Sequence, residues 1–155
     1  MTLDSCKDFP KEIEVPDLLK DKLQLMTNCE LSEREICMFN VSLFYIEKQM
    51  QIDNIDLNDF YRINVIFTED GSFSFHEDSE SVGGMQLHLA IYRMNIIRDR
   101  HTDWLTMFIY VEELTHYFWR IYDENEVKYK VTEILRNIFP KLTVEKMKEV
   151  GIEWK

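Results

Sequence analysis

Three residues in one short stretch, Glu112, Glu113 and His116, have side chains that could bind a metal ion or move a proton. If the stretch is helical, Glu112 and His116 are four residues apart, so their side chains lie on one face. A carboxylate and an imidazole placed in this way can ligate a divalent cation, and a second carboxylate beside them can act as a general base. The spacing therefore predicts a metal site with Glu113 as its catalytic residue.

The residues around this pair predict a helix that is buried on nearly every side. Its apolar positions are Trp104, Leu105, Ile109, Val111 and Phe118. A carboxylate held in such surroundings without a partner costs several kcal/mol. We therefore expect Glu112 to keep its proton, to pair with a cation or to bind a metal.

The five residues from Glu112 to His116 match the H-E-x-x-H pattern of zinc peptidases at every constrained position except the first. Glu112 stands where that pattern has a histidine. Exchanging nitrogen for oxygen weakens the preference for zinc and favours manganese or iron. The expected cofactor is Zn²⁺, with Mn²⁺ or Fe²⁺ as alternatives. If no metal binds, Glu112 and His116 would form a buried pair of acid and imidazole.

A second helix is expected from Glu126 to Phe139, ending before Pro140. The segment from Glu124 to Leu135, which closes on Phe139-Pro140, resembles the E-x-E-A-x-x-F-A-x-x-L helix of ImmA/IrrE-type metallopeptidases. In that family the helix supplies a glutamate as the third metal ligand, and Glu126 matches it best. The resemblance spans about Tyr61 to Pro140 and implies a zincin-like fold. It also implies an association with phages or mobile elements, whose peptidases of this family act on repressor proteins.

Apolar periodicity predicts the elements that would position these residues. Helices are expected at residues 17–23, from the capping box of Ser32 and Glu35 to about Met50, from Thr102 or Asp103 to about Tyr122, and at residues 143–150. Strands are expected at 61–67, 73–76 and 85–91, the first two as a hairpin and the third after a loop at 79–84. Strands that cluster together predict the α+β class. The expected order is N-terminal helices, a small three-stranded sheet, the active-site helix and the glutamate helix.

The 155 residues fit a single domain, with a helical N-terminal part at 1–60 and a zincin-like core at 61–155. Three cysteines without a C-x-x-C pair predict reduced thiols and no cysteine zinc site. The chain begins without the features of a signal peptide, and it has no apolar run of the roughly 20 residues that a membrane span needs. We therefore expect a cytoplasmic protein that does not enter a membrane.

The balance of 29 acidic and 18 basic residues gives a formal charge of -11, which repels nucleic-acid backbones and anionic membranes. The expected partner or substrate is a protein, and a basic one would suit this charge. Two functions are open: a degenerate or atypical metallopeptidase, and an acidic inhibitor or nucleic-acid mimic without catalysis. An open cleft over His116 would favour the first. The second would be favoured if these acids clustered on one face: Glu69, Asp70, Glu77, Asp78 and Glu80.

Overall fold

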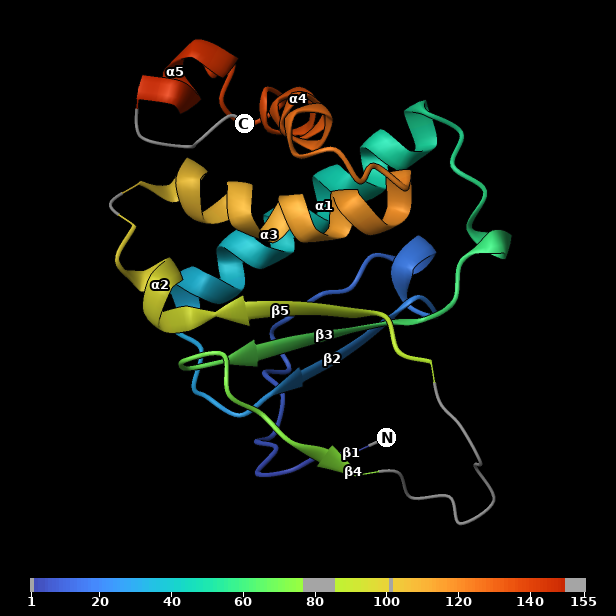
Figure 1. The fold of residues 1–155 in the computed structure, drawn as a ribbon, viewed down its shortest axis with the longest axis vertical. Coiled ribbons are helices and arrows are strands. Elements are labelled where there is room, and N and C mark those ends of the chain that lie inside the picture. Colours follow the sequence, from blue (N-terminus) through green and yellow to red (C-terminus); the bar gives the residue numbers. More distant parts are fainter. Residues whose placement is uncertain (1, 77–85, 101, 150–155) are drawn as a thin grey trace.

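In the computed structural model, which describes residues 2–76, 86–100 and 102–149, a small sheet lies beneath two layers of helices (Figure 1). The strands are β1 Thr2–Leu3, β2 Leu23–Thr27, β3 Ile63–Thr68, β4 Phe75–His76 and β5 Leu89–Arg93. The helices are α1 Glu33–Ile52, α2 Met94–Arg98, α3 Asp103–Trp119, α4 Glu124–Leu135 and α5 Val144–Glu149. α1 and α3 lie next to the sheet, and α4 and α5 lie on their far side. The expected mixture of helices and strands in an α+β chain is confirmed.

The main sheet has the order β2-β3-β5, and both pairings are parallel. Every residue of the central strand β3 is buried, including Val65 on one face and Ile66 on the other. Burial on both faces is characteristic of a parallel sheet, whereas a hairpin strand usually leaves one face in water. The predicted hairpin between 61–67 and 73–76 is therefore wrong. β4 pairs instead with β1 in a separate antiparallel ribbon.

The N-terminal third of the chain contributes an edge strand that the sequence did not reveal. Residues 17–23 were expected to form a helix, but they form a short 3-10 turn at Asp17–Leu19 and then lead into β2. β2, α1 and β3 together make a parallel strand-helix-strand unit. The third strand, expected at 85–91, is β5 at Leu89–Arg93, and the predicted loop at 79–84 lies outside the described residues.

The capping box predicted at the start of α1 is confirmed. The Ser32 hydroxyl accepts a hydrogen bond from the Glu35 N–H at 3.3 Å, and the Glu35 carboxylate accepts one from the Ser32 N–H at 2.7 Å. One turn later, Phe39 lies on the buried face of the helix and is 1% exposed. Its ring meets Phe67 of β3 at 5.0 Å and Tyr110 of α3 at 5.3 Å between centroids. These contacts fix α1 and α3 on the same face of the sheet.

The turn between α3 and α4 determines where the predicted site lies. α3 ends at Trp119, earlier than the expected Tyr122, because Arg120 has a left-handed backbone with φ of 53°. α4 begins at Glu124, where the Asp123 side chain accepts hydrogen bonds from two N–H groups of the first turn. The end of α3 and the start of α4 are therefore only a few residues apart.

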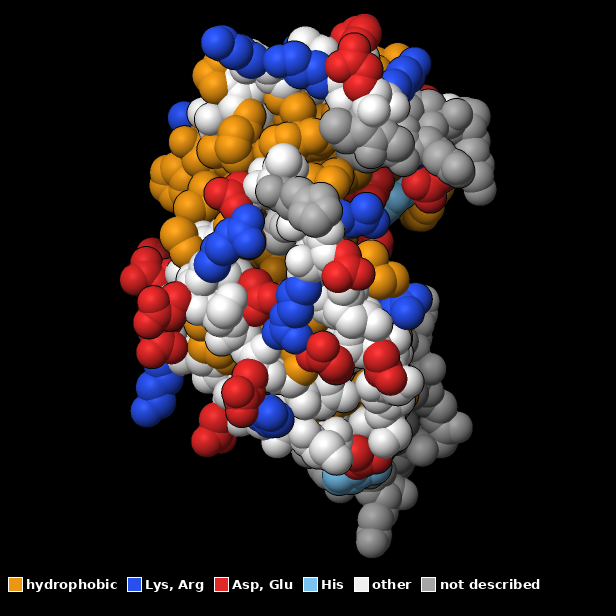
Figure 2. Space-filling view, turned by 90° about the vertical axis from the view of Figure 1, so that its left-hand side faces the viewer, with side chains coloured by type: hydrophobic (Ala, Val, Ile, Leu, Met, Phe, Trp, Pro, Cys, Tyr) orange, Lys and Arg blue, Asp and Glu red, His pale blue; other side chains and the backbone are white. Residues whose placement is uncertain are grey.

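The surface in Figure 2 carries acidic and basic side chains intermixed. Apolar side chains gather in the upper part of this face. Elsewhere in the structure, Trp104, Phe139 and Leu142 help to line a cavity of about 310 Å³ next to α5. No helix in the described part of the chain is both long enough and apolar enough to cross a membrane.

Candidate metal centre

The side chains of Glu112, His116 and Glu124 meet where α3 approaches the first turn of α4. One ligand atom from each residue lies within 4.8 Å of the other two, and His116 Nε2 is 3.9 Å from Glu124 Oε1. Metal-ligand bonds of about 2 Å place the ligand atoms of a tetrahedral ion about 3.4 Å apart. Small side-chain rotations would therefore bring all three donors onto one ion.

A hydrogen bond sets the orientation of the His116 ring. Its Nδ1 lies 2.6 Å from the backbone carbonyl oxygen of Ile121. Because a carbonyl only accepts, Nδ1 must carry a proton, and the other ring nitrogen, Nε2, faces Glu124. Metal-binding histidines are typically held in this way by a bond from their second nitrogen.

The local sequence explains this geometry. The left-handed residue Arg120 reverses the chain, and the carbonyl of Ile121 lies back over the last turn of α3, within reach of His116. Asp123 then caps α4, so Glu124 becomes the first residue of that helix. The N-terminus of a helix favours a negative charge, which suits a ligating carboxylate.

The pKa of Glu112 is raised to about 7, first by burial and then by the neighbouring charges of Glu113 and Glu124. Lys128 and His116 act in the opposite direction. Lys128 lies one turn after Glu124 on α4 and is itself 7% exposed. Its ammonium group does not fully offset the cost of burying the Glu112 carboxylate, so a cation beside Glu112 would favour the ionised form.

Glu113 follows Glu112 on α3, and its side chain is only partly exposed to solvent, with its carboxyl end toward the protein. Burial of its carboxyl group raises its pKa, His116 lowers it, and Glu124 raises it. These effects show that Glu113 is close enough to the cluster to respond to its charges. A carboxyl group with a raised pKa is well suited to exchange protons near neutral pH.

The structure does not bring Glu126 into the cluster. Its side chain is exposed, and its backbone N–H belongs to the Asp123 cap. The face of α4 that packs inward is defined by Val127 and Val131, and Glu124 precedes Val127 by one helical turn. Glu126 points away from that face. The third residue of the set is therefore Glu124 instead of the predicted Glu126.

A cavity of about 320 Å³ opens beside His116, between α3 and the segments that precede β3 and β5. Its lining residues are Asp59, Phe60, Tyr61, Gln86, His88, His116, Tyr117, Arg120 and Tyr122. An open cleft over His116 is the feature expected of a metallopeptidase and not of an acidic inhibitor.

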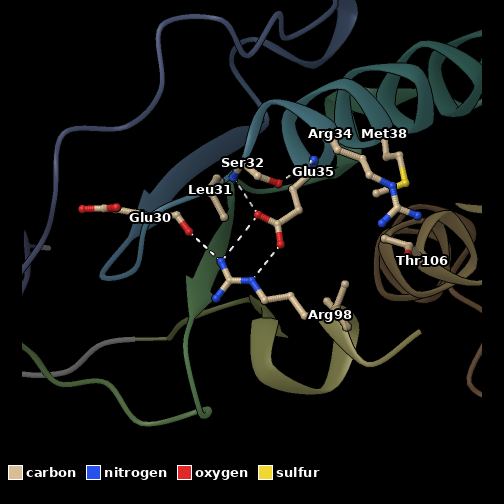
Figure 3. Close-up of a pocket in the computed structure, with 9 residues that line it drawn as sticks. Glu30, Leu31, Ser32, Arg34, Glu35, Met38, Arg98 and Thr106 are labelled. Atoms are coloured by element: carbon tan, nitrogen blue, oxygen red, sulfur yellow. Dashed lines mark hydrogen bonds and ion pairs between the residues drawn. The ribbon is translucent and has the colours of Figure 1, made fainter. Parts of the chain in front are cut away.

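A larger cavity, of about 510 Å³, lies at the opposite end of α3 (Figure 3). About three helical turns separate Thr106, which lines it, from His116. Arg98 crosses this cavity, donating to Glu35 at 2.8 Å, to Glu69 at 2.6 Å and to the carbonyl of Glu30 at 2.7 Å. The charge of Arg98 is neutralised by the carboxylates of Glu35 and Glu69. This ion-pair network links α1 to α2, and Arg98 is therefore not available to bind a ligand.

The pair of Arg98 and Glu35 yields a prediction for stability. Burial raises the pKa of Glu35, but hydrogen bonds from Arg98 and Ser32 outweigh it, and the net pKa is lowered. Arg98→Met should cost about 2 kcal/mol of unfolding free energy at pH 7, because the 9% exposed carboxylate loses its cation. This loss of unfolding free energy should shrink as the pH falls below 4.5, the ordinary pKa of a glutamate, and through the lower pKa of Glu35 in the folded protein.

Urea denaturation at pH 7 and at pH 3 would measure this effect. Arg34→Met is a matched control, since Arg34 pairs with Asp103 at a surface where its side chain is 60% exposed. That substitution should cost less than about 0.5 kcal/mol. Equal losses in the two variants would show that Arg98 contributes no more than a surface pair.

Comparisons of the chain with models of known protein families, with curated proteins and with solved structures found no match. The geometry of Glu112, His116 and Glu124 is therefore the basis on which a function is assigned to this chain.

Proposed function

We propose that this chain is an atypical metallopeptidase-like protein in which Glu112, His116 and Glu124 bind one divalent cation. The observation that carries the proposal is the bond from His116 Nδ1–H to the Ile121 carbonyl, which turns Nε2 toward Glu124 in a cluster that also contains Glu112. One nitrogen and two oxygen donors suit Zn²⁺, and the high share of oxygen also suits Mn²⁺ or Fe²⁺. The resemblance to ImmA/IrrE peptidases stays a prediction.

A divalent cation at such a position polarises a peptide carbonyl and makes nearby water a better nucleophile. The residue of this chain that would move protons is Glu113. Its carboxylate accepts the proton of the attacking water and returns it to the leaving nitrogen, so no net proton change occurs on the protein. The partial exposure of Glu113, its place next to Glu112 on α3 and its raised pKa support this role.

The acidic inhibitor or nucleic-acid mimic has less support. Of the five acids whose clustering would favour it, Glu69 is already paired with Arg98. Glu77, Asp78 and Glu80 lie outside the described residues. Acidic and basic side chains are intermixed on the face in Figure 2. The open cavity beside His116 favours the metallopeptidase-like function.

Glu113→Gln is expected to abolish hydrolysis without removing the metal. The amide cannot accept a proton, and general-base catalysis typically contributes about 100-fold or more to the rate. The assay follows cleavage of fluorescently labelled casein, an unfolded protein substrate, after loading with Zn²⁺, Mn²⁺ or Fe²⁺. Glu126→Gln, an exposed substitution nearby, is the control and should cleave like the wild type.

Two outcomes would count against this assignment of roles. A Glu113→Gln variant as active as the wild type would show that another group is the base. A wild-type protein that holds its metal but cleaves nothing would leave a metal-binding protein without peptidase activity.

A further inference from the structure

The cavity beside His116 is lined mainly by flat rings. Four of its lining residues are phenylalanine or tyrosine and two are histidine, with Arg120, Asp59 and Gln86 completing the wall. At about 320 Å³ it is large enough for a single bulky side chain and small for a whole peptide. The composition and size of this cavity indicate what it can hold.

Three rings of the wall hold one another in place. Tyr61 stacks on His88 with 6.1 Å between centroids and 7° between planes, and His88 meets Tyr117 at 5.2 Å. The Tyr117 hydroxyl donates a 2.9 Å hydrogen bond to the backbone carbonyl of Tyr61. These contacts join the segment before β3, the segment before β5 and α3. The aromatic wall is therefore formed before any ligand arrives, which lowers the cost of binding.

Arg120 supplies a flat cationic surface to the same cavity. Its guanidinium lies over the Phe60 ring at 4.6 Å and donates to the Asp59 carbonyl at 3.3 Å. Phe60 in turn meets Tyr117 at 5.6 Å. A guanidinium fixed in this way can stack on an aromatic ligand, whereas it would repel the ammonium group of a lysine.

Two of the rings at this cavity are largely exposed to solvent. Tyr122 is 86% exposed and Tyr61 is 76% exposed, the highest values among the large apolar side chains of the described residues. Exposed aromatic rings that rim a cavity are characteristic of binding surfaces, where tyrosine is often a dominant contributor.

We propose that this cavity binds an aromatic side chain of the peptide substrate. It would thereby select phenylalanine, tyrosine or tryptophan next to the peptide bond that is cleaved beside His116. The position of that bond rests on the proposed function, because it assumes the metal site. Binding of the ring itself depends only on the walls described above. An aliphatic side chain would fit the volume but would not stack on His88, Tyr61 or Arg120.

Binding of three small probes to the ¹⁵N-labelled full chain would test the proposal: N-acetyl-phenylalaninamide, N-acetyl-alaninamide and N-acetyl-lysinamide. Their dissociation constants come from chemical-shift titrations. The phenylalanine probe should bind at least about tenfold more tightly than the other two, as expected for one aromatic contact of ordinary strength. It should shift the amide signals of Tyr61, His88 and Tyr117. Equal affinities, or tighter binding of the lysine probe, would overturn the proposal.

Three substitutions show whether binding occurs in this cavity. Tyr61→Ala should remove most of the preference for the phenylalanine probe, and Tyr61→Phe should keep it, because the ring is what binds. Both leave the backbone carbonyl that anchors Tyr117. Phe44→Ala removes an aromatic ring that is 54% exposed on α1, away from the cavity, and should change nothing. If Phe44→Ala weakened binding as much as Tyr61→Ala, the probe would be binding elsewhere.

The same titration on metal-free and metal-loaded protein separates the two proposals. A protein that takes up no metal but prefers the phenylalanine probe would refute the metal site and keep this inference. A protein that binds metal but shows no preference among the probes would refute this inference alone.

Discussion

A Glu124→Ala variant is expected to bind Zn²⁺ or Mn²⁺ at least about 100-fold more weakly than the wild type, because it lacks one of three ligands. Glu126→Ala is expected to bind the metal with unchanged affinity. The reason is geometric: Glu124 lies 3.9 Å from His116 Nε2, whereas Glu126 lies outside the cluster. Competition with a coloured chelator at pH 8 would measure both affinities.

The two substitutions form a matched pair. Both residues are glutamates in the first turn of α4, so each substitution removes one negative charge from the same helix end. Any general effect of charge or helix stability should therefore be shared. If Glu126→Ala lost the metal and Glu124→Ala kept it, the ligand set implied by the family resemblance would be right, and the one inferred from the structure would be wrong.

Glu112→Gln is expected to stabilise the metal-free protein at pH 8 by about 1–3 kcal/mol, in proportion to the raised pKa of Glu112. The folded pKa is about 7, above the ordinary glutamate value of 4.5, so folding favours the protonated carboxyl group. Ionised Glu112 lowers the stability of the folded protein. This loss grows as the pH rises from the pKa of Glu112 in the unfolded chain through its pKa in the folded protein. The gain from the substitution should therefore be small at pH 5 and full at pH 8.

Thermal and urea unfolding at pH 5 and pH 8 would test this sign. The same variant should lose metal binding, which would identify Glu112 as a residue that costs stability in return for function. The opposite sign at pH 8 would mean that Glu112 and Lys128 form a stabilising ion pair. In that case the cation beside Glu112 would be the lysine ammonium group.

Residues with strong local signals were predicted well. The capping box of Ser32 and Glu35 marked the start of α1, and the apolar residues around Val111 and Leu114 marked α3 as a buried helix. Both signals depend only on residues close in sequence. The spacing of Glu112 and His116 likewise needed nothing beyond the helical repeat, and the cluster contains both.

Features that depend on distant contacts were missed. β2 is five residues long and becomes a strand through its pairing with β3, some forty residues later in the chain. The alternation at Ile63, Val65 and Phe67 suggested a half-exposed hairpin, but the residues between them are buried as well. Burial on the second face could not be read from the alternation alone.

The third residue of the cluster, Glu124, could have been found from the sequence. The inward face of α4 follows from its apolar spacing at Val127, Val131 and Ile134, and Glu124 extends that spacing by one turn while Glu126 does not. The family motif directed attention to Glu126. The Ile121 carbonyl bonds to His116, and the rings of Tyr61 and His88 line the cavity beside it. These placements depend on the folded chain, and no spacing rule provides them.

Metal content is the most direct test of the central claim that Glu112, His116 and Glu124 form a metal site. The protein would be purified without chelators, and its metal measured by plasma mass spectrometry before and after incubation with Zn²⁺, Mn²⁺ or Fe²⁺. We expect close to one equivalent of one of these ions, and none in a His116→Ala variant whose circular dichroism matches that of the wild type. A correctly folded wild-type protein that takes up none of the three ions would contradict the claim.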